Sequence, residues 1–374
     1  MNGSLQILPV TGIGRIEPGD DLVAIIGEAA PWLQDGDVVV VTSKIVSKAE
    51  GRLVEVPAEG PEREAAREAA LQAETARVVA RRGATRIVAT HHGFVMAAAG
   101  IDASNVDRHR LVLLPKDPDA SARAIRAGLA ERYGRTVAVI ISDTMGRPWR
   151  LGLTDAALGV AGLAPLRDHR GQVDPYGNEL QLTITAVADE LAAAADLVKG
   201  KLDGVPVAVV RGYSGVAPID APDGDGPGAV ALVRDSASDL FSLGTAEARA
   251  AGMAEAARLP LYAPFPGEGP SGVLLADEPP DPQLFADALA DLPLAPSTVV
   301  RFVVTRGAST IIVRCSAARE PRSLVALGMD VQRLRSALHA VGLLTSIVSV
   351  DFEIDENDAD TESVAIAVAA PDRA

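Results

Sequence analysis

The chain has 374 residues, of which 48% are apolar and 23% charged, so it can bury a core and is not disordered by composition. Lysine and arginine total 35 against 50 aspartates and glutamates, and the resulting net charge of −15 excludes a long-range basic surface for nucleic acid or an anionic membrane. The single cysteine, Cys315, allows neither an internal disulfide nor a cysteine-cluster zinc site, which is typical of a reducing cytoplasm.

Targeting and membrane signals are absent from the sequence. The N-terminus has no basic segment followed by a sustained apolar one, and no apolar run approaches the roughly 18–20 residues of a membrane span. Aromatic residues make up only 3% of the chain, which disfavours the base-stacking platforms of nucleic-acid-binding proteins. We therefore expect a cytoplasmic protein with no nucleic-acid partner and no membrane partner.

The predicted elements of the first two thirds mix strands and helices without a steady alternation. In chain order they are a strand at 5–10, a helix at 20–28, a buried strand at 38–41, helices at 61–82 and 119–133, a buried strand at 136–142, a strand at 181–187, a helix at 188–198 and a strand at 205–210. A doubly wound sheet would show a regular strand–helix rhythm. The pattern instead predicts a mixed α/β (α+β) fold.

A domain boundary is predicted near residue 255. A loop at 221–228 and a helix at 239–251 precede a stretch dense in proline and glycine at 260–282. We therefore expect a first domain at 1–255, a linker at 256–282 and a short C-terminal module at 283–374. Within this module the pattern predicts strands at 297–305, 310–313 and 345–352, and a helix at 331–341.

The familiar nucleotide and zinc signatures are missing: there is no P-loop, no dinucleotide-binding glycine fingerprint and no paired-histidine zinc motif. What remains is a set of polar residues at strand ends. Asp143 and Thr144 directly follow the buried strand at 136–142, where a carboxylate and a hydroxyl suit a hard cation that carries phosphate. An aspartate that caps the next turn is an equally good interpretation.

Three further segments allow a similar double interpretation. Asp102 and Asn105 follow a small apolar run, and they are either a metal ligand with a nucleotide contact or parts of an Asx turn. Lysines and hydroxyls at 42–48 follow a buried strand, and they either hold phosphate as point charges or lie in a solvated loop. Two glycines within 11–16 let the backbone approach a ligand closely, which is weak evidence by itself.

Together these segments resemble the coenzyme F420-0:γ-glutamyl ligase family, in particular the N-terminal half of its two-domain actinobacterial-type members. The resemblance rests on LPVTGIGRIEPGDDL, VVVTSKIVSKAEGR, AAAGIDASN, LLPKDPDASA, VIISDTMGRPWR, DPYGNEL, VADELAAAADL and VPVAVVRG, which occur in this order. The runs VTSKIVSKAEGR, AGIDASN and SDTMGR are specific in combination. The resemblance covers residues 5–250.

The resemblance implies an enzyme that uses GTP and a divalent metal, Mg²⁺ or Mn²⁺, to join L-glutamate to the deazaflavin precursor F420-0. The implied path is phosphorylation of a substrate carboxylate and then attack of the glutamate amine on the acyl phosphate, with later additions building a γ-linked tail. A pair of metal ions neutralises the phosphate charge in such a transfer, and K⁺ is a further candidate ion. The family also implies a homodimer with the active site near the subunit contact.

Carried over position by position, the resemblance implies roles for residues in all four segments. Asp102 and Asp143 are expected to bind metal, with Thr144 at a second metal ion, and Lys48 is expected to act in catalysis with Asp143 and Thr144. The nucleotide contacts that it implies are Ile13, Gly14, Arg15, Ile16, Ser43, Lys48 and Asn105. Arg147 and Glu190 are secondary candidates because of their neighbourhoods.

The C-terminal third departs from the family pattern. The two-domain relatives continue with a longer, flavin-binding nitroreductase-like domain, whereas residues 283–374 are fewer and lack an arginine-rich opening for FMN. We interpret this module as a diverged or truncated remnant and do not expect FMN. Two other functions stay open: a non-catalytic homologue that binds a nucleotide or deazaflavin, and an amide ligase that acts on another carboxylate.

Overall fold

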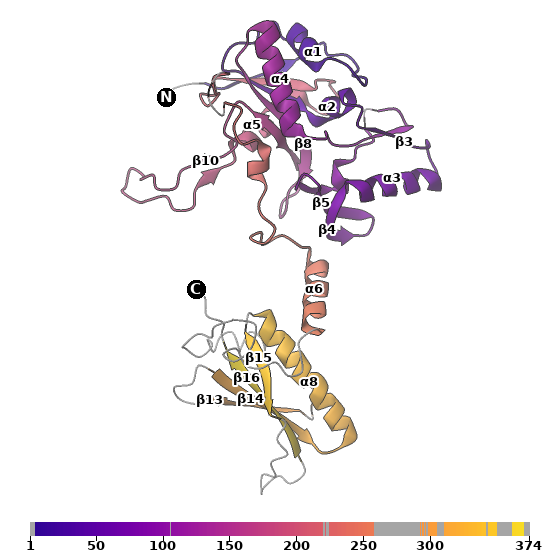
Figure 1. Ribbon diagram of the computed structural model, residues 1–374, viewed down its shortest axis with the longest axis vertical. Helices are drawn as coiled ribbons and strands as arrows, with labels where there is room; N and C mark the ends of the chain where they lie inside the picture. The colour runs from indigo at the N-terminus through magenta and orange to yellow at the C-terminus, as the bar shows by residue number, and fades with distance from the viewer. Residues whose placement is uncertain are drawn as a thin grey trace. The chain divides into compact units, whose positions relative to one another are not determined.

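The computed structural model describes residues 4–104, 106–219, 221, 224–257, 292, 294, 296, 298–304, 310–341, 343–349 and 361–369 (Figure 1). The chain divides into two compact units, Met1–Gly244 and Thr245–Ala374. This division falls eleven residues before the predicted boundary, and the predicted linker lies outside the described residues from 258 onward. The predicted domain bounds therefore stay a prediction.

The first unit contains short strands, helices and two 3₁₀ turns. In chain order its elements are β1 (Gln6–Val10), α1 (Leu22–Ala29), β2 (Val38–Thr42), α2 (Ser43–Ala49), β3 (Leu53–Glu55), α3 (Pro61–Glu74), β4 (Thr75–Arg82), β5 (Thr85–Thr90), β6 (Val95–Ala97), η1 (Ala98–Gly100), β7 (Arg110–Val112), α4 (Pro118–Tyr133), β8 (Ala138–Gly146), β9 (Leu153–Ala161), β10 (Arg167–Asp168), β11 (Ile184–Thr185), α5 (Val187–Lys199), β12 (Val207–Arg211) and η2 (Ala229–Leu232).

A five-stranded sheet with the order β1-β12-β2-β8-β9 forms the centre of this unit. β2 and β8 are parallel, whereas the other three neighbouring pairs are antiparallel. The sheet is mixed and several helices pack on it, so the predicted mixed α/β fold is confirmed.

Both faces of the central sheet are covered, because successive strand residues point to opposite sides. Val39, Val41 and Val139 pack in one core with apolar residues of α1, α2 and α4. Val38 and Val40 pack in a second core with the alanine-rich helix α5. Burial on both sides explains why these strands are continuous apolar runs rather than alternating ones.

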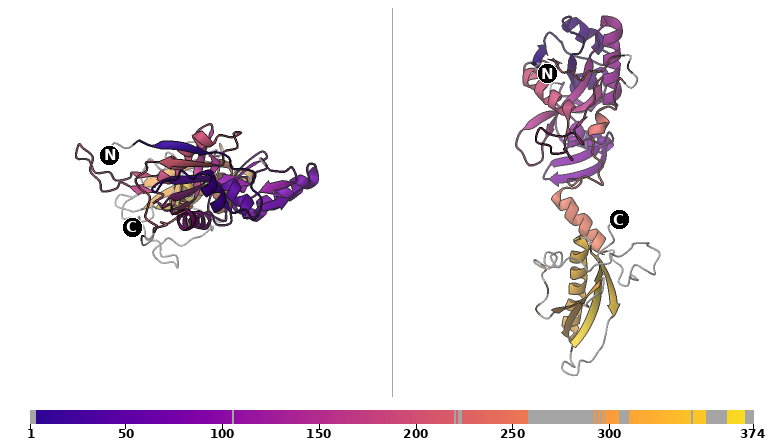
Figure 2. Two further views of the ribbon diagram at one scale, coloured as in Figure 1. Left: turned by 90° about the horizontal axis from the view of Figure 1, so that it is seen from above. Right: turned by 90° about the vertical axis from the view of Figure 1, so that its left-hand side faces the viewer.

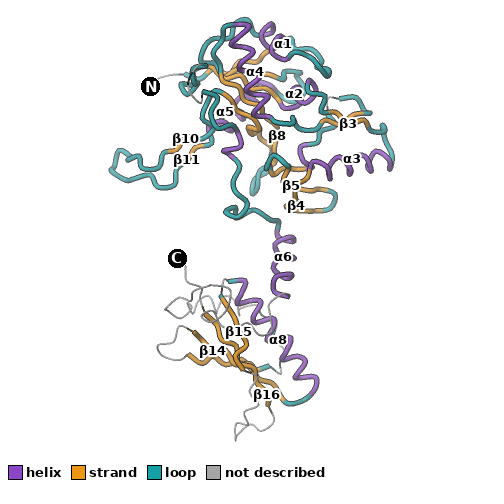
Figure 3. The backbone as a smooth tube through the Cα atoms, viewed as in Figure 1, coloured by secondary structure: helices purple, strands orange, loops and turns teal. Residues whose placement is uncertain are grey.

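Two predicted elements of the first unit are wrong in part. The predicted helix at 61–82 ends at Glu74, and residues Thr75–Arg82 form β4, which pairs with β5. The β-branched Thr75, Val78 and Val79 favour this strand once a partner is present. The predicted strand at 181–187 is only the two-residue β11, which pairs with β10 in a hairpin that extends from the unit (Figure 3).

The second unit contains a four-stranded antiparallel sheet, with the strand order β13-β14-β16-β15. Its elements are α6 (Thr245–Ala257), β13 (Val299–Val304), β14 (Thr310–Ala318), α8 (Pro321–Ala340), β15 (Leu344–Ser349) and β16 (Thr361–Ala369). Helix α8 lies along the sheet (Figure 2). Its residues Leu334 and Leu338 pack in one core with apolar residues of the strands. It begins at Pro321 rather than at the predicted 331, because proline is well tolerated in the first helical turn.

None of the described helices is long and apolar enough to span a lipid bilayer.

Candidate active site

Four chain segments meet at one edge of the central sheet because of its strand directions. β2 and β8 are parallel, so both C-terminal ends lie there, with Thr42 opposite Ser142. β12 is antiparallel to β2, so its N-terminal end lies at the same edge, where the Thr42 amide donates to the Pro206 carbonyl at 2.9 Å. β1 is antiparallel to β12, which places Val10 beside Val207. The segments brought together are 11–16, 42–48, 143–146 and 199–206.

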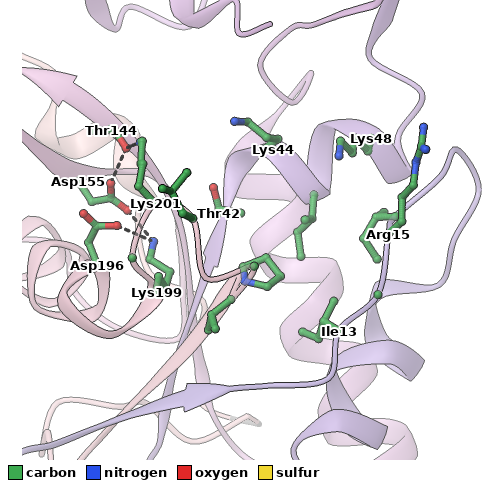
Figure 4. A pocket seen from close by; sticks show the side chains of 18 residues that line it. Ile13, Arg15, Thr42, Lys44, Lys48, Thr144, Asp155, Asp196, Lys199 and Lys201 are labelled. Carbon is green, nitrogen blue, oxygen red and sulfur yellow. Dashed lines mark hydrogen bonds and ion pairs between the residues drawn. The ribbon is translucent and has the colours of Figure 1, made fainter. Parts of the chain in front are cut away.

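Parts of these segments line a cleft of about 480 Å³ (Figure 4). The lining has two acidic side chains and five basic ones. The acidic residues are Asp155 and Asp196, and the basic residues are Arg15, Lys44, Lys48, Lys199 and Lys201. Only five of the 35 basic residues of the chain are lysines, and four of these five line the cleft. A chain with a net charge of −15 thus concentrates compact positive charges at one place, which suits an anionic ligand.

On one side of the cleft, hydrogen bonds link Lys201, Thr144, Asp155 and Lys199 in series (Figure 4). Lys201 Nζ donates to Thr144 Oγ1 at 2.8 Å, and that hydroxyl donates to Asp155 Oδ1 at 3.0 Å. Asp155 Oδ2 accepts from Lys199 Nζ at 2.6 Å and from Ser142 Oγ at 2.8 Å. Lys199 and Asp155 are each 3% exposed, so this ion pair is fixed inside the protein.

The backbone between the two lysines requires glycine. Gly200 has φ 63° and ψ −177°, a combination that only glycine adopts readily. Gly200 therefore lets α5 end at the buried Lys199 while Lys201 turns to Thr144.

Helix α2 contributes the opposite side of the cleft, through Lys44 and Lys48 (Figure 4). These lysines are four residues apart and so lie on one face of the helix. Lys44 Nζ forms an ion pair with Asp102 and donates to Ser104 Oγ at 2.8 Å. Burial, together with the positive charges of Lys44 and Arg15, lowers the pKa of Lys48.

Asp102 lies just after a strained turn. Ala98 and Ala99 have φ of 49° and 54°, in the left-handed region that alanine rarely adopts. Asp102 also accepts from the Ser104 amide at 2.6 Å, which is the Asx turn that was the alternative interpretation. The carboxylate therefore both closes a turn and faces the Lys44 ammonium.

Asp143 lies inside β8, which continues to Gly146 instead of ending at the predicted Ser142. Burial raises the pKa of Asp143 to about 6, and the negative charges of Asp155 and Asp102 act in the same direction. The Thr144 amide, which donates to Asp143 Oδ1 at 2.9 Å, lowers it in part. Asp143 is thus a partly buried carboxylate whose surroundings disfavour its negative charge, although the Lys44 ammonium acts in the opposite direction.

The structure brings six of the predicted site residues to the lining of the cleft: Ile13, Gly14, Arg15, Ile16, Lys48 and Thr144. Three predicted residues do not line the cleft: Ser43, Asp102 and Asp143. Ser43 precedes the lining residue Lys44, Asp143 precedes the lining residue Thr144, and Asp102 forms an ion pair with Lys44. Ser43 is 4% exposed, at the start of α2. Asn105 lies outside the described residues.

The two secondary candidates lie elsewhere. Arg147 is exposed and donates to the Leu151 carbonyl at 2.8 Å. Glu190 lines a different cavity, beside Ile7 of β1 and Tyr213. Neither residue lines the lysine-rich cleft.

The charged lining residues that were not among the predicted site residues are Lys44, Asp155, Asp196, Lys199 and Lys201. Of these, only Lys44 lies in one of the four polar segments that the sequence analysis singled out, 42–48. Two sequence signals point to four of them. Lysine is rare in a chain that otherwise uses arginine, and four of the five lysines line the cleft. Asp155 is the one carboxylate in the otherwise apolar run of β9.

The donor set fits one divalent cation at Asp102 and Asp143. Within the described residues, no group of three or more histidine, cysteine, aspartate or glutamate side chains is placed to hold a metal ion. Mg²⁺ is usually bound by one or two carboxylates, with substrate phosphates and water completing its shell. Asp102 already forms an ion pair with the Lys44 ammonium, so a metal ion bound by this carboxylate would share it with Lys44 or displace that lysine.

Comparisons with known proteins agree with the location of the cleft. The sequence profile of the F420-0:Gamma-glutamyl ligase family matches residues 12–212, which include every residue that lines the cleft. The chain is 44% identical over 226 residues to the coenzyme F420:L-glutamate ligase of Methanothermobacter thermautotrophicus, covering 56% of this chain and 89% of that protein. It is 42% identical over 253 residues to the enzyme of that name from Haloarcula marismortui, covering 63% and 95%. The chain belongs to the F420-0:gamma-glutamyl ligase family.

Proposed function

We propose that this chain joins L-glutamate to coenzyme F420-0, with GTP as phosphate donor and Mg²⁺ or Mn²⁺ as the required ion. Further γ-linked glutamates extend the product. The observation that carries the proposal is the lysine-lined cleft, which lies wholly within the residues that match the family. The names of the relatives from Methanothermobacter thermautotrophicus and Haloarcula marismortui support the same reaction.

The proposed reaction has two steps. A carboxylate oxygen of F420-0 attacks the γ-phosphorus of GTP, which gives an acyl phosphate and GDP. The amine of glutamate then attacks the acyl carbon, so that a C–N bond forms, the C–O bond to phosphate breaks and the amine proton passes to solvent. The divalent ion, when bound, supplies charge neutralisation at the transferred phosphate.

The chain's own residues bind and orient the reactants in this proposal. Asp102 and Asp143 hold the ion. Lys48 and Arg15 neutralise phosphate oxygens from the α2 side of the cleft, and the glycine at position 14 lets the backbone approach the nucleotide. These contacts are positioned by the rigid sheet edge, which reduces the entropy lost when the reactants meet.

Mass spectrometry tests the proposed function directly. Incubation with F420-0, L-glutamate, GTP and Mn²⁺ is expected to give a product heavier by one glutamyl residue, together with GDP. Omission of the metal, of GTP or of glutamate is the control. Binding of GTP and F420-0 without any product would favour the non-catalytic homologue, and ligation only to another carboxylic acid would favour the related amide ligase.

Replacing Lys48 with alanine is expected to raise the KM for GTP about tenfold, because one charge-assisted contact to phosphate is lost. The KM for glutamate is expected to change much less. Steady-state kinetics with each substrate varied in turn measures the two values. Lys116→Ala is the matched control, since Lys116 is the lysine that does not line the cleft. A glutamate defect with normal GTP dependence would place Lys48 at the acceptor instead.

Removal of all residues after Gly244 is expected to leave ligation intact. Every lining residue of the cleft precedes residue 207, and the first compact unit ends at Gly244. The measurement is the ligation rate of the shortened chain after its fold is checked by circular dichroism. A folded, soluble but inactive shortened chain would contradict the two-part interpretation. Aggregation would show that the removed residues cover apolar surface.

We further propose that the chain assembles as a homodimer and needs no FMN. Light scattering after gel filtration measures the first property. A yellow, FMN-loaded full-length protein would contradict the second.

A further inference from the structure

The position that the family resemblance implies for a second metal ion, at Thr144, has a different charge from the position at Asp102 and Asp143. At Asp102 and Asp143, two carboxylates and the Lys44 ammonium sum to −1. At Thr144, the Lys199 and Lys201 ammonium groups and the Asp155 and Asp196 carboxylates sum to 0. A divalent cation is therefore attracted to the first position, whose net charge is negative, and gains no such attraction at the second.

The donor atoms at the second position are already in use. Thr144 Oγ1 donates its one proton to Asp155 at 3.0 Å and accepts from Lys201 Nζ at 2.8 Å. Asp155 Oδ2 accepts both from Lys199 and from Ser142, at 2.6 and 2.8 Å. A metal ion bound there would have to displace an ammonium group from the hydroxyl or break the buried ion pair.

The two lysines differ in burial, but the ammonium groups of both are held by hydrogen bonds. Lys199 is 3% exposed, and Gly200 fixes the direction in which the chain continues to Lys201. The Lys201 side chain is exposed, and its Nζ ends at the cleft beside Thr144. An ammonium at this place offers further N–H donors to a phosphate oxygen after its bond to Thr144 is made.

We propose that the Lys201 ammonium takes the place of a second metal ion in this chain. The site then binds one divalent cation, at Asp102 and Asp143, and Lys201 contacts the nucleotide phosphates directly. The inference rests on the proposed function, because it assumes a nucleotide in the cleft.

Counting bound metal tests the inference without an activity measurement. The full chain is dialysed to equilibrium with Mn²⁺ and a non-hydrolysable GTP analogue, and metal and nucleotide are measured on both sides of the membrane. One Mn²⁺ per bound analogue is the expected result. Two Mn²⁺ per bound analogue in the unmodified chain would overturn the inference.

The variant Lys201→Gln gives a second, independent readout. It lowers the local charge from 0 to −1 and supplies an amide oxygen, which is a ligand that Mn²⁺ and Mg²⁺ accept. We expect the count to rise to two Mn²⁺, and the analogue to bind about tenfold more weakly when Mn²⁺ is limiting. Lys116→Gln removes the same charge outside the cleft and is expected to match the unmodified chain in both values.

Failure of this inference is distinguishable from failure of the proposed function. Glutamate ligation with two bound ions would overturn the inference and leave the proposed function standing. One bound ion without ligation to F420-0 would overturn the proposed function and leave the inference about the metal count standing. An unchanged metal count together with unchanged analogue affinity in Lys201→Gln would also overturn the inference, since the ammonium would then contribute nothing to the site.

Discussion

Replacing Asp143 with asparagine is expected to slow glutamate ligation by a factor on the order of 100 or more, while the fold is retained. Asparagine has nearly the same size and can still accept the hydrogen bond that the Thr144 amide makes at 2.9 Å. It lacks the negative charge that we propose holds the divalent cation. Initial rates at saturating Mn²⁺ and GTP measure the effect, and near-normal turnover would remove Asp143 from the metal site.

The same variant is expected to be more stable than its parent at neutral pH. The pKa of Asp143 is raised from 3.8 to about 6, mainly by burial, so the folded protein holds this proton more tightly than the unfolded chain. The stability that protonated Asp143 contributes is fully present below pH 3.8 and is lost as the pH rises through about 6. Asparagine carries no charge at any of these pH values. The free energy of unfolding of the variant, relative to that of its parent, therefore increases as the pH rises from 3.8 to about 6.

Urea unfolding at several pH values, followed by tryptophan fluorescence, measures this advantage. Both tryptophans, Trp32 and Trp149, belong to the first unit, so the signal reports that unit alone. A variant that is slower but more stable separates a loss of function from a loss of folding. The measured quantity is the difference in stability between Asp143→Asn and its parent. If this difference favoured the variant less at neutral pH than at acid pH, the buried-carboxylate interpretation would be contradicted.

Asp189→Asn is the matched control for the rate measurement. Burial also raises the pKa of Asp189, and its carboxylate accepts from the Ala157 amide at 2.8 Å. It does not line the cleft. Its replacement therefore removes a half-buried charge without touching the proposed metal site, and we expect the ligation rate to stay close to that of the parent.

The cleft residues that could be predicted from the sequence include those at the C-terminal ends of the parallel strands β2 and β8. The runs at 38–41 and 136–142 are buried on both faces and are recognisable as strands, so residues just after them, such as Lys48 and Thr144, could be singled out. Parallel strands end at the same edge, and this is where β2 and β8 bring those residues. The local pattern placed these residues at strand ends but left a structural interpretation open, and the family resemblance was needed to choose between the two.

Other cleft residues come from antiparallel neighbours and were therefore missed. Lys199 and Lys201 precede β12, and Asp155 lies near the beginning of β9, because antiparallel strands bring their N-terminal ends to this edge. Strand direction depends on long-range pairing, which a single sequence does not reveal. The same limit explains β4: its strand conformation depends on pairing with β5, which local helix propensity at 61–82 conceals.

Replacing Lys199 with methionine is expected to lower the free energy of unfolding of the first unit by about 3–5 kcal/mol. The methionine fills most of the space of the lysine stem but leaves the carboxylate of Asp155, which is 3% exposed, without its ammonium partner. The hydroxyls of Ser142 and Thr144 still donate to that carboxylate, but neither carries a charge to offset it. Urea unfolding followed by tryptophan fluorescence measures the loss, and Lys116→Met is expected to change stability by no more than about 0.5 kcal/mol.

A double-mutant cycle decides whether the ion pair itself accounts for the loss. Asp155→Asn alone leaves the buried Lys199 ammonium with Ser142 Oγ at 2.9 Å and with the partly exposed Asp196 carboxylate at 4.0 Å, but without its buried carboxylate partner, so it is expected to destabilise the unit as well. With Lys199→Met and Asp155→Asn together, no buried charge is left unpaired, and the asparagine amide can still bond to the neighbouring hydroxyls. We therefore expect the double variant to be more stable than Lys199→Met, because an uncompensated charge costs more than a neutral polar contact. Additive losses in the double variant would show that the two side chains contribute independently, and the buried pair would then not be the element that holds the start of β9 to the end of α5.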